Sequence, residues 1–216
     1  MDSRQLRRRL ELDKMMGVDA LPRRRRDERA AKLARVEQEV KKCTTCRLHE
    51  TRTRTVFGRG DLRARLMFVG EAPGADEDRE GVPFVGRAGK LLDRMVYAMG
   101  LERDEVYITN ILKCRPPGNR NPRPEEIARC LPYLKKQIQI INPKIICTLG
   151  KFSTQNLLNT TRGITYLRGQ KFTLSNNTIL LPTLHPAACI YKPYWREQFI
   201  MDLKMVKEEI DKITKT

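Results

Sequence analysis

Four short apolar runs, separated by longer amphipathic stretches, constrain the fold of this 216-residue chain more than any other feature. Each run is rich in Ile, Val, Leu or Phe, and they cover residues 66–70, 106–109, 144–149 and 178–181. Strands that are hydrophobic almost throughout suit a parallel sheet covered by helices on both faces. The alternation of strand-like and helix-like segments therefore predicts an α/β fold.

The amphipathic stretches predict helices over about 29–42, 88–99, 124–140, 150–158 and 194–213, and a weaker pattern around 164–174 predicts a hairpin of two strands. Residues 1–28 contain dense arginine runs interrupted by Gly17 and Pro22, which predicts a loosely ordered basic arm. That arm is open to two interpretations, a solvated tail or a DNA contact. Residues 29–216 are expected to form a single catalytic domain.

The charge balance indicates the kind of partner. The chain has 43 Lys and Arg against 26 Asp and Glu, a net charge of +17. Such a balance favours polyanionic partners, first nucleic acid and second an anionic membrane surface, although purely structural binders share it. The sequence has no apolar run long enough to span a membrane and no secretory signal, so a cytoplasmic protein is expected.

Six cysteines in such a chain suit metal ligands and core residues better than a disulfide framework. Cys43 and Cys46 form a CxxC flanked by Lys, Thr and Arg, and Cys114 and Cys130 follow as isolated cysteines. Four thiolates satisfy either tetrahedral zinc or a 4Fe-4S cluster. Zinc sites usually pair two CxxC knuckles, so the cluster is favoured. The remaining two, Cys147 and Cys189, are expected to be buried as small hydrophobes.

Polar side chains follow three of the predicted strands. Glu71 comes after the first strand, Asn110 ends the second, and His185 follows the fourth. Ligands of open parallel sheets bind outside the carboxyl ends of the strands, so these three side chains are predicted to face one cleft. The sequence lacks the glycine-rich loops that bind nucleoside triphosphates, GxxxxGK[ST], and dinucleotides, GxGxxG, so nucleotide binding is not expected. Gly70 is expected to bring the backbone close to a ligand instead.

An ordered set of motifs resembles a family 4 uracil-DNA glycosylase, over roughly residues 38–213. The motifs are GEAPGADED at 70–78, GVPFVGRAG at 81–89, YITN at 107–110, KCRPP at 113–117 and HPAA at 185–188. The resemblance is to the iron–sulfur type of archaea and thermophiles. It implies a three-layer α-β-α sandwich with a central four-stranded parallel sheet, a 4Fe-4S cluster, and hydrolytic release of uracil from DNA that leaves an abasic site.

The resemblance also implies which residues hold the uracil once it has been flipped out of the DNA. Phe84 stacks on the base, although core packing is its alternative role. The Asn110 side chain donates its NH2 to O4 and accepts N3–H, a pattern that cytosine reverses. Glu77 is a candidate for excluding thymine sterically, and Gly70 and Ala72 complete the uracil-binding set.

Two residues are candidates for the chemistry. His185, in its neutral form, would donate a hydrogen bond to uracil O2 as negative charge develops there. Glu71 would orient water or stabilise the cationic sugar. Ala72 stands where the better-known glycosylase family carries an aspartate, so the general base is left open.

The loop over 115–124 is stiff and positive, with four prolines and three arginines. Because it lies between two cluster ligands, we predict that the cluster has a structural role and anchors the loop against DNA phosphates through Arg115, Arg120 and Arg123. A plain surface connection and a redox role for the cluster are the alternatives. The predicted partner is single- or double-stranded DNA that contains uracil. Repair or replication proteins are further possible partners, and a monomer is expected.

Two rival functions would each explain part of the sequence. A family 5 glycosylase would accept a broader range of bases, but Asn110 and Glu71 favour family 4. A non-enzymatic iron–sulfur module that binds DNA would explain the charge and the cysteines, but not the polar loops after three strands.

Overall fold

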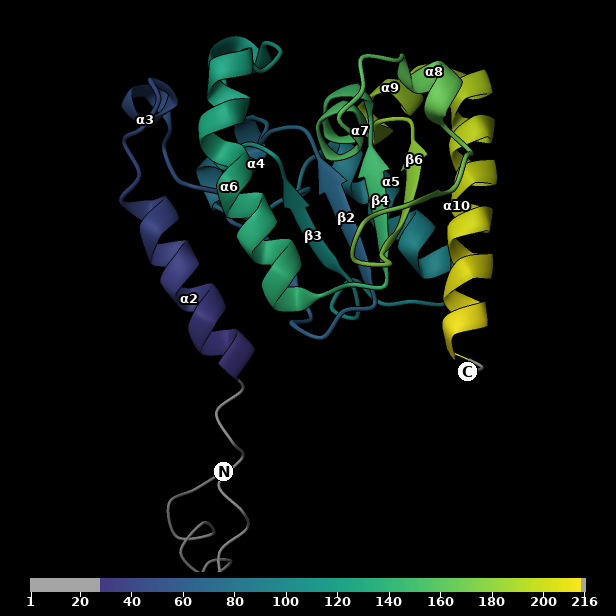
Figure 1. Ribbon diagram of the computed structural model, residues 1–216. Helices are drawn as coiled ribbons and strands as arrows, with labels where there is room; N and C mark the ends of the chain where they lie inside the picture. The colour runs from purple at the N-terminus through teal and green to yellow at the C-terminus, as the bar shows by residue number, and fades with distance from the viewer. Residues whose placement is uncertain (1–27, 215–216) are drawn as a thin grey trace, which may run out of the picture.

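A six-stranded sheet lies at the centre of the computed structural model, which describes residues 28–214 (Figure 1). Its order is β1-β3-β2-β4-β6-β5, and the four central strands are parallel. The strands are β1 (Arg59–Gly60), β2 (Leu66–Gly70), β3 (Tyr107–Asn110), β4 (Ile145–Leu149), β5 (Phe172–Thr173) and β6 (Ile179–Thr183). The four predicted strands form the parallel centre, so the α/β class is confirmed. Two short antiparallel edge strands, β1 and β5, extend it.

Helices surround the sheet. They are α2 (Glu28–Lys41), α3 (Leu48–Thr51), α4 (Ala75–Glu80), α5 (Arg87–Ala98), α6 (Pro124–Ile141), α7 (Lys151–Leu158), α8 (Ile164–Leu167), α9 (Pro186–Cys189) and α10 (Pro193–Thr214), with a 3₁₀ turn at Pro117–Asn119. All five predicted helices are present with nearly the predicted bounds.

The hairpin predicted around 164–174 is wrong. Residues 164–167 form the single-turn helix α8, and β5 pairs with β6 instead. Arg168 explains the difference, because its guanidinium donates to Asp202 of α10 at 2.6 and 3.0 Å and holds this segment against α10. Gly169, with a φ of +67°, then turns the chain toward β5.

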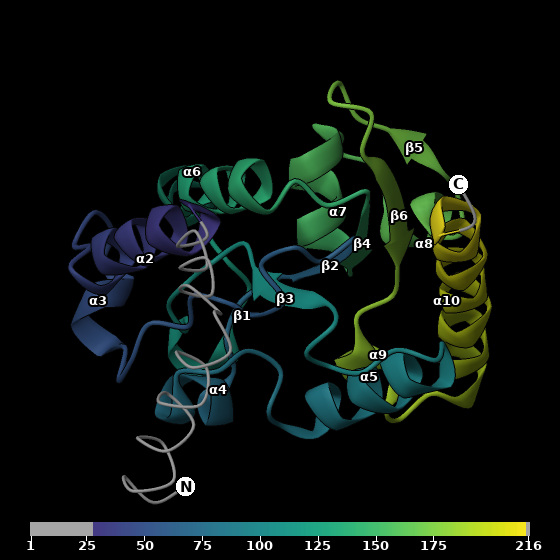
Figure 2. The ribbon, with the colours of Figure 1, turned by 90° about the horizontal axis from the view of Figure 1, so that it is seen from below.

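The sheet separates two hydrophobic cores, because side chains alternate between its faces along each strand. From β2, Leu66 and Phe68 pack into the core that α5 and α10 cover. Met67 and Val69 pack into the other, beneath α2 and α6. Figure 2 shows α2, α6 and α7 on one side of the sheet and α5 on the other. The three-layer arrangement follows from this alternation.

The basic arm predicted for residues 1–28 lies outside the described residues except for Glu28, so the arm and its boundary stay predictions. In the part of the chain that the structure describes, no helix has the length and apolar character needed to cross a membrane.

Candidate active site

A pocket of about 410 Å³ opens beside the carboxyl ends of β2, β3 and β6. Its size falls within the range of small-ligand sites. The structure brings together in its wall the three residues that follow the strands, together with Ala72, Glu77 and Phe84. The lining residues are Glu71, Ala72, Pro73, Gly74, Glu77, Phe84, Ala88, Asn110, Pro116, Asn119, Arg120, His185, Ala187 and Ala188.

Gly70 is buried beneath these side chains rather than part of the wall. In the register of the sheet it lies opposite Asn110. A Cβ at Gly70 would lie 2.3 Å from Asn110 Oδ1 and 2.6 Å from Cζ of Phe84. Both distances are shorter than any tolerable contact. A glycine is therefore needed here so that the amide and the aromatic ring can meet at the floor of the pocket.

The side-chain amide of Asn110 has an unsatisfied acceptor. Asn110 is 2% exposed, and its Oδ1 is the one buried side-chain polar atom of residues 28–214 that lacks a hydrogen-bond partner. A buried acceptor without a partner costs about 1–3 kcal/mol. An N–H group of a bound base would supply that partner.

Phe84 and His185 lie side by side in the pocket, with ring centroids 5.8 Å apart and planes inclined by 30°. Phe84 is 5% exposed, so it packs in one hydrophobic core and also lines the pocket, and its stacking on a base stays a prediction. Its φ of +53° is rare for an aromatic residue. That strained conformation points to a functional constraint on the loop.

The tautomer of His185 follows from its hydrogen bond. Its Nδ1 accepts the backbone N–H of Ala187 at 3.2 Å, which leaves the proton on Nε2. Burial lowers the pKa of His185 to about 4, and the nearby Glu77 carboxylate acts weakly in the opposite direction. The ring is therefore neutral at pH 7 and has one N–H to donate.

Burial also changes Glu71, the other candidate for the chemistry. Desolvation raises the pKa of its carboxyl group to about 7. A carboxyl group with a pKa near the working pH can exchange a proton or orient water as a carboxylate. Perturbed groups of this kind gather at functional sites.

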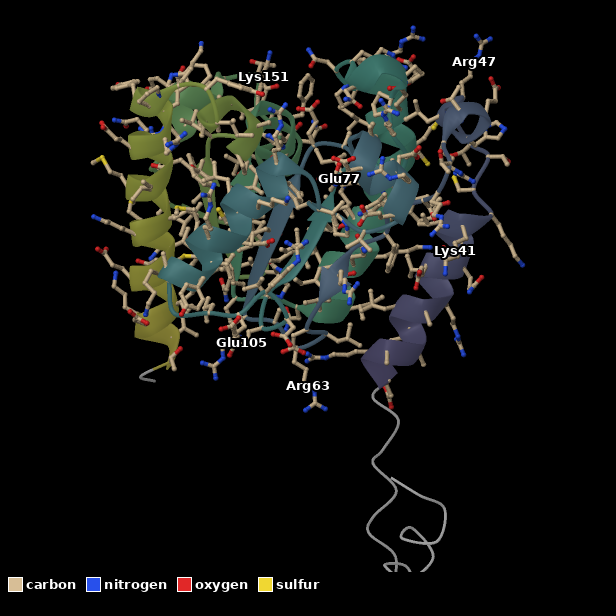
Figure 3. All side chains as sticks on the ribbon, turned by 180° about the vertical axis from the view of Figure 1, so that it is seen from behind. Lys41, Arg47, Arg63, Glu77, Glu105 and Lys151 are labelled. Carbon is tan, nitrogen blue, oxygen red and sulfur yellow. The ribbon has the colours of Figure 1, made fainter. Side chains whose placement is uncertain are left out.

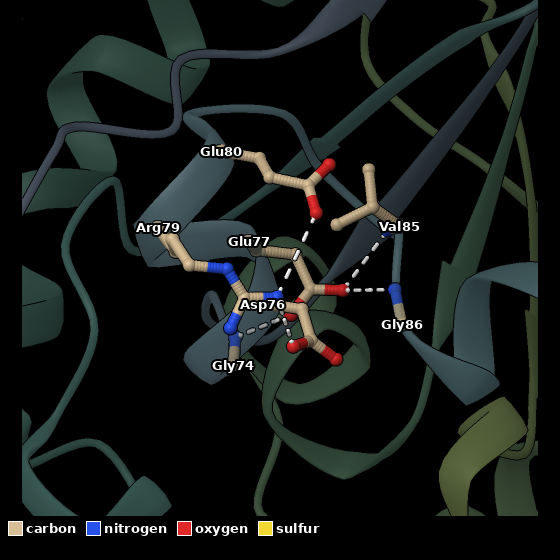
Figure 4. Close-up of polar contacts among 7 residues, drawn as sticks. All are labelled: Gly74, Asp76, Glu77, Arg79, Glu80, Val85 and Gly86. Atoms are coloured by element: carbon tan, nitrogen blue, oxygen red, sulfur yellow. Dashed lines mark hydrogen bonds and ion pairs between the residues drawn. The ribbon is translucent and has the colours of Figure 1, made fainter.

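Glu77 has a role that its sequence position does not reveal. One carboxylate oxygen accepts the backbone N–H groups of Val85 and Gly86, and the other accepts that of Gly74, all at 3.0 Å (Figure 4). The carboxylate thus joins the loop after β2 to the loop that carries Phe84. Its place in the pocket wall is compatible with the predicted exclusion of thymine, which stays a prediction.

The four predicted cluster ligands, Cys43, Cys46, Cys114 and Cys130, line a single cavity. All six cysteines of the chain are free thiols, and Cys147 and Cys189 are fully buried in the core. Within residues 28–214, no three His, Cys, Asp or Glu side chains come together closely enough to hold one metal ion.

The three arginines predicted to contact DNA differ in their surroundings. Arg115 is half-buried and donates to Asn119 at 2.7 Å, whereas Arg120 pairs with Glu126 at 2.5 and 2.9 Å in the pocket rim. Arg123 lines a shallow groove beside the cysteines. Two arginines that the prediction omitted, Arg47 and Arg129, share this groove.

The charged side chains labelled in Figure 3 lie at both ends of the molecule. Arg47 and Lys151 lie at the end where the parallel strands terminate, with Glu77 between them in that view, and Arg63 and Glu105 lie at the opposite end. Labelled basic side chains thus occur at both ends of the molecule, two at the end of the strand termini and one at the other.

Comparison with known proteins decides the family. Residues 57–204 match the family model of the uracil DNA glycosylase superfamily. The chain is 47% identical over 184 residues to a type-4 uracil-DNA glycosylase of Sulfurisphaera tokodaii, a match that covers 82% of this chain and 84% of the relative. The chain belongs to the type-4 uracil-DNA glycosylases. A second type-4 enzyme, from Archaeoglobus fulgidus, is 43% identical over 80% of this chain and 90% of its own.

Membership of the type-4 family confirms the resemblance seen in the ordered motifs. A type-5 uracil-DNA glycosylase of Pyrobaculum aerophilum is also similar, at 35% identity, but the match covers only 46% of this chain and 50% of that enzyme. The type-5 alternative is therefore not favoured. A non-enzymatic module is not favoured either, because the similarity extends over the whole pocket.

Proposed function

We propose that this enzyme removes uracil from DNA by hydrolysing its N-glycosidic bond, as a step of base-excision repair. The unpaired Oδ1 of Asn110 carries the proposal. Uracil presents N3–H next to O4, so one side-chain amide satisfies both positions, accepting with its oxygen and donating with its nitrogen. Cytosine presents an acceptor and a donor in the reverse order and would leave buried groups unpaired.

The flipped base would lie against Phe84, with Asn110 at one edge and His185 at another. Negative charge develops on uracil as the glycosidic bond breaks. The Nε2–H of His185 would donate a hydrogen bond to that charge at O2, a stabilisation of the oxyanion-hole type. The low pKa of His185 suits this role, because a neutral donor needs no proton transfer.

Glu71 would act on the other reacting partner. In its ionised form it can orient the attacking water and stabilise positive charge on the sugar. Because its pKa is about 7, the ionised fraction changes strongly around neutral pH. Ala72 lines the same pocket and supplies no competing carboxylate, so Glu71 is our candidate for the residue that handles water.

We further propose that Cys43, Cys46, Cys114 and Cys130 hold a 4Fe-4S cluster. Their four thiols line one cavity, which fits the donor set of such a cluster. One CxxC with two isolated cysteines differs from the paired CxxC knuckles that are usual in zinc sites, which favours a cluster. A bound cluster would cross-link the α2–α3 segment, the loop after β3 and α6.

DNA would bind across the end of the molecule that carries the pocket. Arg115 and Arg123 remain candidates for phosphate contacts, and Arg47 and Arg129 are further candidates because they share the groove of Arg123. Arg120 is already paired with Glu126, so its contribution would be at the pocket rim. A monomeric, cytoplasmic enzyme stays our prediction.

Excision from oligonucleotides that contain uracil, hypoxanthine, thymine or a mismatched base tests the proposed function. We expect abasic product from uracil alone, in both single- and double-stranded DNA. Release of cytosine at a comparable rate would contradict the base-reading role of Asn110, whereas hypoxanthine and thymine present the same N–H and carbonyl as uracil and must be excluded by shape. Absence of abasic product from iron-loaded protein would contradict the function itself.

A further inference from the structure

A fully buried lysine lies between the cysteine cavity and the base pocket. Lys113 is 1% exposed, and its Nζ donates to Thr109 Oγ1 at 2.7 Å, to the Asn110 carbonyl at 2.6 Å and to Gln137 Oε1 at 2.6 Å. Three N–H groups therefore meet three acceptors, which is the full donor count of an ammonium group. All three acceptors are uncharged.

Burying an ammonium group among neutral acceptors is costly, so a lysine at this position calls for an explanation. The cysteines provide part of it. The backbone N–H of Lys113 donates to Cys130 Sγ at 3.3 Å, and Lys113 lines the same cavity as the four thiols. Thiolates at Cys114 and Cys130 would place negative charge beside the ammonium group.

The other part of the explanation is Asn110. This residue ends β3, and the chain then turns so that the N–H groups of Ile111 and Leu112 bond the carbonyls of Gly70 and Glu71. Lys113 reaches back across this turn to the Asn110 carbonyl. The ammonium group thus fixes the backbone of the residue whose side chain forms the floor of the pocket.

Gln137 keeps the ammonium group in place. It is fully buried on α6, the helix that also carries Cys130. Its Nε2 donates to the Phe57 carbonyl at 2.9 Å and contacts the Tyr107 hydroxyl at 3.1 Å. Because the amide nitrogen is occupied on that side, Oε1 must face Lys113. This hydrogen-bond network joins α6 to β3 directly behind the pocket.

We propose that Lys113 is a positioning residue, held by Gln137, that fixes Asn110 in the orientation needed to bind uracil and links this orientation to the cysteine cavity. The inference rests on the proposed function of uracil excision. Removing either side chain should weaken uracil recognition more than DNA binding. A buried network with a purely structural role would instead weaken both together with the fold.

The test compares wild type with Lys113→Met and Gln137→Leu, and Gln139→Leu serves as the control because it is the same change at an exposed position of α6. Four quantities are measured on iron-loaded protein. They are the single-turnover rate of uracil excision, the affinity for free uracil from an NMR titration, the affinity for an undamaged oligonucleotide, and the melting temperature with iron content.

We expect both variants to bind free uracil roughly tenfold more weakly and to excise it roughly ten- to a hundredfold more slowly, as for the loss of a charged hydrogen bond. Affinity for undamaged DNA should stay within about twofold of wild type, and Gln139→Leu should match wild type throughout. If Lys113→Met loses iron, the positioning role is judged from Gln137→Leu alone, because Gln137 forms no hydrogen bond with a cysteine.

Unchanged uracil affinity and rate in Gln137→Leu would overturn the inference. So would a parallel loss of stability, DNA affinity and rate, since that is the pattern of a structural role. The proposed function fails separately, if wild-type protein makes no abasic product. In that case the titrations with free uracil still decide whether Lys113 and Gln137 position Asn110.

Discussion

Gly70 of β2 lies directly opposite Asn110 of β3, so close that a Cβ on Gly70 would come within 2.3 Å of Asn110 Oδ1. The floor of the pocket therefore depends on the absence of a side chain at one position as much as on the presence of an amide at the other. Phe84 Cζ lies within 2.6 Å of the same Cβ position. A single methyl group at Gly70 would displace both residues that are proposed to hold the base.

Gly70→Ala is expected to reduce uracil excision by roughly a hundredfold and to cost about 1–3 kcal/mol of stability through overpacking. Single-turnover rates and thermal unfolding measure the two effects. Gly163→Ala is the matched control, since its Cβ would meet only Thr165 Oγ1, at 3.8 Å. Near-normal excision by Gly70→Ala would show that Asn110 and Phe84 do not need their observed positions.

The pH dependence of excision is expected to follow Glu71. Its pKa of about 7 means that the ionised form gains population as pH rises from 6 to 8, so the single-turnover rate should rise through this range. His185, with a pKa of about 4, stays neutral throughout and adds no second limb. Glu71→Gln should give a low rate that is independent of pH. A wild-type profile that is flat between pH 6 and 8 would remove Glu71 from the mechanism.

The contribution of Glu71 to the free energy of unfolding should fall as pH rises, whereas the excision rate should rise. The folded pKa of Glu71 lies above its unfolded value of 4.5, so the folded state binds more protons between pH 4.5 and 7. Stability from this group is therefore greatest at low pH and is lost as pH rises toward 7. The melting temperature of Glu71→Gln minus that of wild type should therefore be larger at pH 8 than at pH 5.

Glu77→Gln separates two roles of one residue. The amide can keep the bonds to Val85 and Gly86 but would turn a donor toward the N–H of Gly74, so we expect uracil excision to fall by roughly tenfold. Glu80→Gln, an exposed position on the same helix, is the control. Unchanged uracil excision by Glu77→Gln would contradict the role of the carboxylate bonds. Because Gln keeps the size of Glu, the steric exclusion of thymine is tested instead by Glu77→Ala, which should then release thymine.

The sequence predicts the centre of the fold well because its strands are buried on both faces and so appear as continuous apolar runs. The edge strands β1 and β5 have two residues each, too few to show any periodicity. The hairpin error had a similar origin: the pairing of Arg168 with Asp202 joins residues 34 positions apart. Tertiary contacts of this kind determine the secondary structure of short segments, and the local sequence pattern gives no sign of them.

In the candidate site too, some residues could be predicted from the sequence and others could not. Glu71, Asn110 and His185 were predictable because the carboxyl ends of parallel strands meet at one edge. The structural contributions of Glu77 and Lys113 were not, because Glu77 acts on backbone N–H groups and Lys113 is a charged residue that the packing buries. A charged residue in a loop motif normally suggests solvent or DNA. Only the packing shows that Lys113 faces inward.

The most direct test of the account is uracil excision by Asn110→Ala, measured under single-turnover conditions beside binding of an undamaged oligonucleotide. The unpaired Oδ1 is proposed to be the acceptor for uracil N3–H. The account predicts a rate at least about a hundredfold below wild type, from the loss of two buried hydrogen bonds, with DNA affinity retained. Excision at the wild-type rate by a folded, iron-loaded Asn110→Ala protein would contradict it.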